Sequence, residues 1–330
     1  MRTVIKIIFL FLVTIKAVHA QILPNLGGQR VGTSAAQFLK IGVGSRSAAL
    51  GQAYVALAND AEALYWNPAG ISQFDKNEVI FANTRWFVDT QLEFAGIVYH
   101  LSQANSIGFS VTYLHTEEMK ETTVLQPFGT GRYFNYSDAL LSLTFARNMT
   151  ERFSFGLSVK YMNETLAELT MQSFLFDLGT YYKTGWKSVR FGVAVSNFGR
   201  DMAPSGSFRY ENLENEIVEV NSFQEFSPPT VFRIGVASEL FENDQHKFTS
   251  AVQLNHPNDN DENVNLGLEY WWKDVFSLRG GYVSGREEEN FSLGFGVHLP
   301  LSVVDFRFDY AFSNFGRLGY VNRFTAHLQF

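Results

Sequence analysis

The stretch VVDFRFDYAF, residues 303–312, alternates apolar and charged side chains. Asp305, Arg307 and Asp309 fall on one face, and the other face carries large apolar side chains, which are Val304, Phe306, Phe308, Tyr310 and Phe312. A strict period of two predicts an extended strand whose two faces meet different surroundings. A soluble β-sandwich also buries such an aromatic face, but it does not repeat it through many consecutive long strands without exposing strand edges.

The same alternation recurs from about Glu78 to the last residue. In RFSFGLSVKYM, residues 152–162, and in NFSLGFGVHL, residues 290–299, large apolar residues alternate with small or polar ones. This pattern is typical of strands with lipid outside and a filled or wet lumen inside. We therefore predict an all-β fold, a transmembrane antiparallel β-barrel of about 14 strands over residues 78–330. The strands are expected near residues 78–86, 92–101, 105–115, 136–147, 153–163, 171–183, 188–199, 229–240, 246–255, 261–272, 275–283, 289–299, 303–313 and 320–330.

The connections between these segments support a barrel. Links after even-numbered strands are short, whereas the two long links, residues 116–135 and 200–229, both follow odd-numbered strands. A barrel with both chain ends in the periplasm alternates the side of its connections, with short periplasmic turns and longer extracellular loops. The two long loops are therefore expected on the extracellular side.

The beginning of the chain indicates export. Residues 1–20 combine Arg2 and Lys6 with a short apolar core and small residues before Gln21. This arrangement is typical of a cleaved secretory signal peptide, and the apolar core is too short to span a bilayer as a helix. We expect the mature protein in the cell outer membrane, with outer-membrane lipids around it.

The last stretch, RFTAHLQF, carries the alternation to Phe330. Phe324 and Phe330 fall on the expected lipid side, and Arg323 and His327 fall on the inward side. The stretch resembles the C-terminal signal of bacterial outer-membrane barrels, and this resemblance implies the barrel assembly machinery as a partner.

Composition limits the other function classes. The chain has no cysteine, so closed hydrogen bonding rather than disulfides must stabilise the exported protein. A net charge of -7 argues against nucleic acid as a partner.

No histidine lies in a Ser-His-acid motif, and we expect no enzyme activity and no cofactor. Asp259, Asp261 and Asn263 have a spacing that can surround calcium, but the rest of that ligand set is missing, and a polar extracellular turn is the favoured reading.

Residues 21–77 do not alternate. They are rich in alanine and glycine and predict short helices and turns. Asp60 is expected to cap a helix that starts with AEALYW, because aspartate accepts hydrogen bonds from free amides at a helix start. Pro68 is expected to end that helix, because the residue before a proline is pushed out of helical space.

The stretch GSRSAALGQAYVALANDAEALYWNPAGI, residues 44–71, closely resembles the N-terminal signature of the PorV/PorQ family, a branch of the FadL-like outer-membrane barrels. The matching positions are Arg46, Gly51, Ala56, Asp60, Trp66, Asn67, Pro68, Ala69 and Gly70. The resemblance implies that residues 21–77 form a hatch inside the barrel. Within it, Asp60, Trp66, Asn67, Pro68 and Gly70 are the expected anchoring residues.

The same resemblance implies a function in type IX secretion or related surface-protein assembly, in which the barrel binds the C-terminal domains of secreted proteins or components of the translocon. The alternatives are a FadL-type channel for hydrophobic small molecules and a structural outer-membrane protein. Charged residues on inward faces favour a plugged barrel over an apolar conduit, because an unpaired charge in an apolar path costs several kcal/mol. These residues are Lys160, Arg190, Arg233, Glu269, Arg307 and Asp309.

The second long loop is the candidate partner-binding site. It mixes apolar side chains with acidic ones that would steer a basic partner. The apolar residues are Met202, Phe208, Tyr210, Phe223 and Phe226, and the acidic ones are Glu211, Glu214, Glu216, Glu219 and Glu225.

Overall fold

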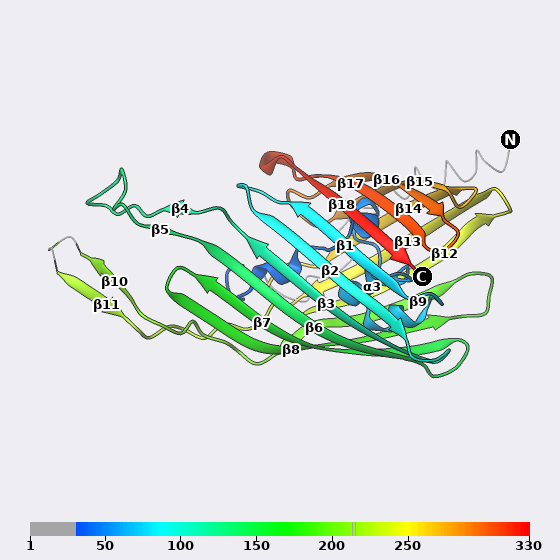
Figure 1. Cartoon of the computed structure of the whole chain (residues 1–330), viewed down its shortest axis with the longest axis horizontal. Coiled ribbons are helices and arrows are strands. Elements are labelled where there is room, and N and C mark those ends of the chain that lie inside the picture. The colour runs from blue at the N-terminus through cyan, green and yellow to red at the C-terminus, as the bar shows by residue number, and fades with distance from the viewer. Residues whose placement is uncertain (1–30, 213, 215) are drawn as a thin grey trace.

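The structure is a computed structural model that describes residues 31–330 except 213 and 215. Within this range, 14 antiparallel strands close into a barrel (Figure 1). They are β1 (Glu78–Arg85), β2 (Gln91–His100), β3 (Asn105–His115), β6 (Tyr136–Asn148), β7 (Phe153–Leu166), β8 (Leu169–Lys183), β9 (Arg190–Gly199), β12 (Val231–Glu242), β13 (His246–Pro257), β14 (Asn263–Trp272), β15 (Phe276–Ser284), β16 (Phe291–Pro300), β17 (Asp305–Asn314) and β18 (Tyr320–Gln329). Every expected strand is confirmed, with its ends within about three residues of the prediction.

The barrel closes by pairing its first strand with its last. β1 and β18 are antiparallel from Glu78 opposite Gln329 to Arg85 opposite Asn322. The amide of Phe330 then donates to the carbonyl oxygen of Asn77 at 3.0 Å. Closure leaves no free edge among the 14 strands, which satisfies the backbone hydrogen bonds that a bilayer cannot.

The two faces of the strands are as the alternation predicted. In β7, Phe153 and Phe155 are exposed on the outside, whereas Ser154, Ser158 and Lys160 are buried in the lumen. In β18, the buried inward residues are Arg323, Thr325 and His327. The aromatic side chains therefore cover the outer wall, and the polar ones line the inside.

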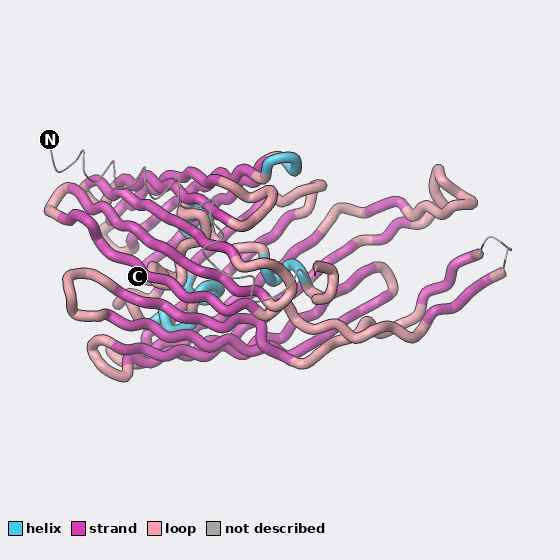
Figure 2. The backbone as a smooth tube through the Cα atoms, turned by 180° about the vertical axis from the view of Figure 1, so that it is seen from behind, coloured by secondary structure: helices cyan, strands magenta, loops and turns pink. Residues whose placement is uncertain are grey.

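Both long loops form hairpins that extend beyond the same end of the barrel (Figures 1 and 2). The first contains β4 (Met119–Lys120) and β5 (Tyr133–Phe134), and the second contains β10 (Phe208–Glu211) and β11 (Ile217–Val220). We call this the hairpin end. The connections after β2, β6, β8, β12, β14 and β16 are all short and lie at the opposite end, which we call the turn end. Both long loops therefore lie on one side, as predicted.

Residues 31–77, here called the lumenal segment, lie inside the barrel (Figure 2). Their short helices are η1 (Gln37–Lys40), α2 (Ser45–Ala49), α3 (Ala63–Trp66) and η2 (Pro68–Ser72), and a further one, η3 (Gly316–Leu318), lies in the loop between β17 and β18. No helix in the described part of the chain is long and apolar enough to cross a membrane. Residues 1–30, which hold the expected signal peptide, lie outside the described residues.

The helix around Trp66 ends where predicted but begins differently. Asn67 is extended, with φ -159°, directly before Pro68, so α3 stops at Trp66. The prediction that Asp60 is the cap is wrong, because the cap position is Glu62 and no side chain caps the helix. Asp60 instead accepts a hydrogen bond from the Glu62 amide at 3.1 Å, in the turn before the helix. Its other oxygen forms ion pairs with Arg46 and Arg307.

Candidate functional site

Glycines on the barrel wall allow the lumenal segment to lie directly against the strands. A Cβ atom added at Gly281 would overlap the backbone at Gly51, and one added at Gly192 would overlap the backbone at Val55. Around the wall, a Cβ atom at each strand glycine that faces this segment would come within 3.0 Å of a backbone or side-chain atom of the segment. These glycines are Gly96, Gly108, Gly156, Gly179, Gly192, Gly235, Gly267, Gly281 and Gly294. Because interiors are close-packed, this contact leaves little free space between segment and wall.

The YWNPAGI stretch is fixed by hydrogen bonds as well as by packing. The indole Nε1 of Trp66 donates to the Val43 carbonyl at 2.8 Å, and the Arg233 guanidinium of β12 lies 5.3 Å from the Trp66 ring. The Asn67 amide donates to the carbonyls of Val55 at 2.9 Å and Thr180 of β8 at 3.1 Å.

Asn67 and the residues after it set the turn into η2. The Asn67 side-chain oxygen accepts from the Ala69 amide at 3.1 Å, which caps η2, and Pro68 occupies its first position. Gly70 packs so closely on Ala58 that a Cβ atom there would overlap the Ala58 carbonyl. The expected hatch residues other than Asp60 therefore act through packing and backbone contacts.

A network of buried charges joins the lumenal segment to the wall. Arg46 of α2 binds Glu269 of β14 through two contacts, Nε to Oε2 at 2.8 Å and Nη2 to Oε1 at 2.9 Å. Its third nitrogen, Nη1, donates to Asp60 at 2.9 Å and to Asn59 at 2.8 Å. Each of the three guanidinium nitrogens donates to at least one acceptor, and such pairing is what makes a buried arginine tolerable.

The network continues along the neighbouring strands. Arg279 of β15 bridges Glu269 at 2.7 Å and Asp309 at 2.6 Å. Arg307 of β17 bridges Asp309 at 2.9 Å and Asp60 at 2.7 Å. These inward charges are therefore compensated by one another and by the lumenal segment.

His327 of β18 extends the network to the barrel seam. Its Nδ1 contacts the carboxylate of Glu78 in β1, and Nε2 lies 2.8 Å from a nitrogen of Arg307. Glu62 completes the inner side by accepting the amides of Arg46 at 3.1 Å and Ser47 at 3.0 Å. The charges thus connect the segment to both strands that close the barrel.

Asp60 has a strongly perturbed carboxyl group. Burial alone would raise the pKa of this carboxyl, but the guanidiniums of Arg307 and Arg46 hold its pKa well below the usual value of 3.8. The hydroxyl of Tyr54 also donates to it at 2.7 Å. The charged Asp60 carboxylate therefore links the lumenal segment to β17 through its ion pair with Arg307.

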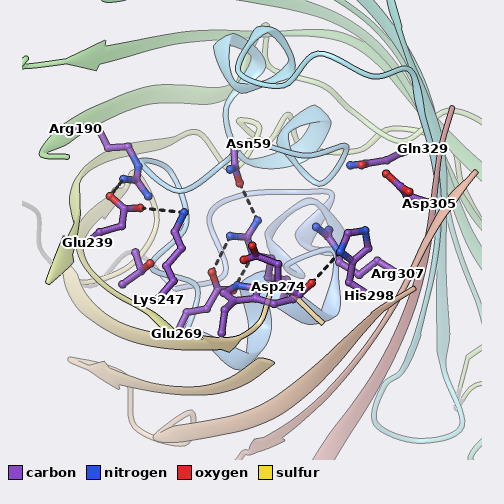
Figure 3. Close-up of a pocket in the computed structure, with 13 residues that line it drawn as sticks. Asn59, Arg190, Glu239, Lys247, Glu269, Asp274, His298, Asp305, Arg307 and Gln329 are labelled. Atoms are coloured by element: carbon purple, nitrogen blue, oxygen red, sulfur yellow. Dashed lines mark hydrogen bonds and ion pairs between the residues drawn. The ribbon is translucent and has the colours of Figure 1, made fainter. Parts of the chain in front are cut away.

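A polar recess of about 290 Å³ lies between the segment and the wall at the turn end (Figure 3). Arg190 there donates to the Ala56 carbonyl at 3.1 Å and pairs with Glu239 at 2.7 Å. Thr249 lines the same recess with a buried hydroxyl that has no hydrogen-bond partner. The recess suits water or a small polar molecule and is a poor entry for an apolar one.

The fold resembles that of solved outer-membrane channels and transporters. The CymD monoaromatic hydrocarbon channel aligns with a TM-score of 0.59 at 13% identity, over 88% of this chain and 97% of that one. The toluene transporter TodX of Pseudomonas putida aligns at 0.57 and 12% identity, over 92% and 99%. The toluene transporter TbuX of Ralstonia pickettii aligns at 0.55 and 12% identity, over 87% and 97%. At these identities the likeness shows the fold alone, and no curated protein matches the chain.

The family model of the type IX secretion system protein PorV matches residues 25–257, well over half of the chain. The chain belongs to the PorV family. For an outer-membrane barrel of this family we expect the turn end in the periplasm and the hairpin end outside the cell, since such barrels have short periplasmic turns and long extracellular loops.

The candidate partner-binding residues of this PorV-family protein gather on the second hairpin. Phe208 stacks on Tyr210 and on Phe223, with ring centroids 6.0 Å and 6.4 Å apart. Met202 and Phe226 pair through their backbones at the base of the hairpin, where Met202 is buried. The structure thus brings three of the five into one aromatic row and leaves two in the hairpin base.

Sequence reasoning missed an apolar tip on the first hairpin. Phe128 is 91% exposed, and Val124 and Leu125 beside it are also exposed. Their signal in the sequence was the run TVLQPF inside an otherwise polar loop. Large exposed apolar residues at a loop tip are typical of contact sites.

The remaining sequence candidates have simpler surroundings. Asp259 pairs with Lys40 of the lumenal segment at 2.8 Å, and the described residues hold no cluster of three or more His, Asp or Glu suited to a metal ion. Phe324 lies against Tyr310 on the outer wall, and Phe330 is exposed. Recognition of these two phenylalanines by the assembly machinery stays a prediction.

The sequence also missed the roles of Glu62 and Glu78. Both are completely buried. Glu78 contacts His327, and Glu62 accepts a hydrogen bond from the Ser47 amide. The available signal was an acidic residue inside an alanine-rich segment and another at the start of an alternating strand.

Proposed function

We propose that this protein is a non-enzymatic, plugged outer-membrane barrel that binds protein partners in type IX secretion. The membership in the PorV family carries this proposal. In this proposal residues 1–20 direct export and are removed, residues 21–77 form the hatch, and residues 78–330 form the barrel. The specific partners we propose are C-terminal domains of secreted proteins or components of the translocon.

The paired charges of the lumen support a plug over a conduit. An apolar substrate would have to displace a segment that is held by Arg46–Glu269 and by Arg307–Asp60. Separating one partner of a buried ion pair leaves an uncompensated charge and costs about 3–5 kcal/mol. The lumen is therefore used for stability, and binding is assigned to the surface.

The extracellular hairpins supply that surface. Lipid covers the outer wall and the periplasmic turns are short, so a broad face is available only at the hairpin end. Residues 200–229 hold six acidic and two basic side chains, a net charge of -4, which would steer a basic partner. The aromatic row on the second hairpin and the apolar tip of the first would then provide the anchoring contacts.

A channel for hydrophobic small molecules is the second candidate. The structures that resemble the fold include toluene transporters and a monoaromatic hydrocarbon channel, which favours this alternative at the level of fold. A channel requires that the lumenal segment move or that the wall open.

The test replaces residues 203–226 with a short Gly/Ser turn. The variant is expected to keep heat-modifiable gel migration, which reports a folded barrel, and to lose most of its capture of secreted C-terminal domains and translocon components in pull-downs. The matched control replaces residues 243–245, the turn between β12 and β13, with Gly/Ser and should capture as the wild type does. Undiminished capture by the folded 203–226 variant contradicts the proposal, and uptake of toluene by proteoliposomes would favour the channel.

A further inference from the structure

The second hairpin extends from the barrel as a two-stranded ribbon (Figure 1). Among the described strands, β10 and β11 pair only with each other, with Phe208 opposite Val220 and Tyr210 opposite Val218. These four side chains share one face of the ribbon, because alternate residues of a strand point to the same side. Phe208 is 37% and Tyr210 is 47% exposed, so this apolar face is open to solvent. A two-stranded ribbon is marginally stable in water, and a further strand that joins it adds stability.

The base of the hairpin is fixed on both sides. Ser205, before β10, exchanges two backbone hydrogen bonds with Thr170 of β8, at 2.7 Å and 3.0 Å. On the other side, Ser34 of the lumenal segment pairs with Ser227, and the Ala35 amide donates to the Ser227 carbonyl at 3.1 Å. The outer half of the hairpin is therefore held in position without a partner, which lowers the entropy cost of binding one.

Above this base, β11 presents unpaired backbone groups. At the end of the ribbon, the Asn212 amide donates to the Glu216 carbonyl at 2.9 Å. Because bonded and non-bonded residue pairs alternate in an antiparallel ribbon, Ile217 and Glu219 belong to non-bonded pairs. Their amides and carbonyls point away from β10, and no described residue forms a backbone hydrogen bond with them. Such an edge is a template for pairing with another strand.

The open edge is that of β11 rather than that of β10. A Cβ atom added at Gly206 would lie 2.7 Å from the Glu168 carbonyl, so the turn between β7 and β8 stands beside the start of β10. The lumenal segment meets the other side only at Ser227, after β11 has ended. Four exposed acidic side chains lie on or near β11 and attract a basic partner. They are Glu214, Glu216, Glu219 and Glu225.

We propose that β11 binds its protein partner by accepting a further strand on this free edge. The inference rests on the proposed function and specifies how that partner binds. The added strand is an extended segment that alternates apolar and basic residues. Its backbone bonds to Ile217 and Glu219, its apolar side chains extend the face that holds Phe208 and Tyr210, and its basic side chains lie near the acidic ones. In strand addition the main-chain hydrogen bonds supply affinity and the alternate side chains supply specificity.

A proline at position 219 tests the backbone contact. Glu219→Pro removes an outward amide and leaves the ladder to β10, because proline is tolerated where a strand amide faces solvent. Glu219→Ala is the matched control, since it removes the same carboxylate and keeps the amide. The probe is the C-terminal domain of a secreted protein, bound to the purified full-length barrel. We expect Glu219→Pro to bind about tenfold more weakly than Glu219→Ala, the effect of losing about one backbone hydrogen bond. Heat-modifiable migration confirms that both barrels fold, and equal affinities of the two variants overturn the proposal.

Site-resolved hydrogen exchange of the wild-type barrel distinguishes strand addition from docking through side chains alone. The bound domain should slow exchange of the Ile217 and Glu219 amides. Unchanged exchange at these two amides in a barrel that captures the domain overturns strand addition and leaves the proposed function standing. No capture by the wild type overturns both. Slow exchange of the same amides in a dimer of the purified barrel, without the domain, also overturns the proposal and assigns the edge to a second copy of this chain.

Discussion

Arg46 and Glu269 form a buried two-point ion pair that ties the lumenal segment to the barrel wall, with nitrogen–oxygen distances of 2.8 Å and 2.9 Å. They are 223 residues apart in the chain. Both carboxylate oxygens and two of the guanidinium nitrogens are used, so the pair fixes the orientation of α2 as well as its position. This relationship predicts how the segment responds when one partner is removed.

Arg46→Met should release the segment from the wall. It leaves Glu269 and Asp60 with one guanidinium fewer, and breaking a buried pair in this way costs about 3–5 kcal/mol. We expect a lower thermal unfolding temperature in detergent and faster protease cleavage within residues 44–71. Arg209→Gln breaks the exposed pair with Glu219 and should change neither. An unchanged melting curve for Arg46→Met would show that the ion pair does not hold the segment.

Asp60→Asn should flatten the acid dependence of stability. The pKa of Asp60 in the folded protein lies below its unfolded value of 3.8. Its carboxylate therefore adds stability that is fully present above about pH 5 and is lost as the pH falls toward the folded pKa. We expect the gap in melting temperature between wild type and Asp60→Asn to be large at pH 7 and to narrow toward pH 3. A gap that stays constant, as expected for the exposed control Asp244→Asn, would contradict this role.

Gly281→Ala should disturb the contact between wall and segment, and its neighbour supplies the control. A Cβ atom at Gly281 would overlap the backbone of Leu50 and Gly51, whereas one at Gly280 meets nothing closer than Leu293 at 3.7 Å. Overpacking of this kind costs about 1–3 kcal/mol. We expect Gly281→Ala to lower stability or to open a measurable conductance in planar bilayers, and Gly280→Ala to do neither. Identical behaviour of the two variants would mean that the lumenal segment shifts to accommodate the added methyl group without loss of stability.

Asn67→Ala should weaken the turn that follows α3. It removes the cap of η2, worth about 1 kcal/mol, and takes the Asn67 side-chain donor away from the carbonyls of Val55 and Thr180, at about 1–3 kcal/mol. Asn67→Asp keeps the capping oxygen but not the donor, so it should not restore stability. Thermal unfolding of both Asn67 variants tests this, with the exposed loop substitution Asn221→Ala as control. Full stability of Asn67→Asp would show that only the cap matters.

The strands were predictable because alternation is a local property of a membrane barrel. In β7, each apolar residue from Phe153 to Tyr161 faces outward simply because the next residue faces inward. The helix that ends at Trp66 was predictable for a similar reason, because Pro68 restricts its neighbour through covalent geometry. The role of Asp60 was not, because local propensity made it a cap while its strongest partners lie in other strands.

The sequence by itself determined the number of strands, which side chains face lipid, which loops are long, and the small residues that let a segment fit inside. Each of these follows from spacing along the chain. Only the tertiary structure decided which charges meet, because Arg46 reaches Glu269 and Arg307 reaches Asp60 through barrel closure rather than through any sequence pattern. It also decided that Asn83 stands opposite Glu93 and Arg85 opposite Gln91 on the outer wall, since strand register sets which residues of neighbouring strands meet.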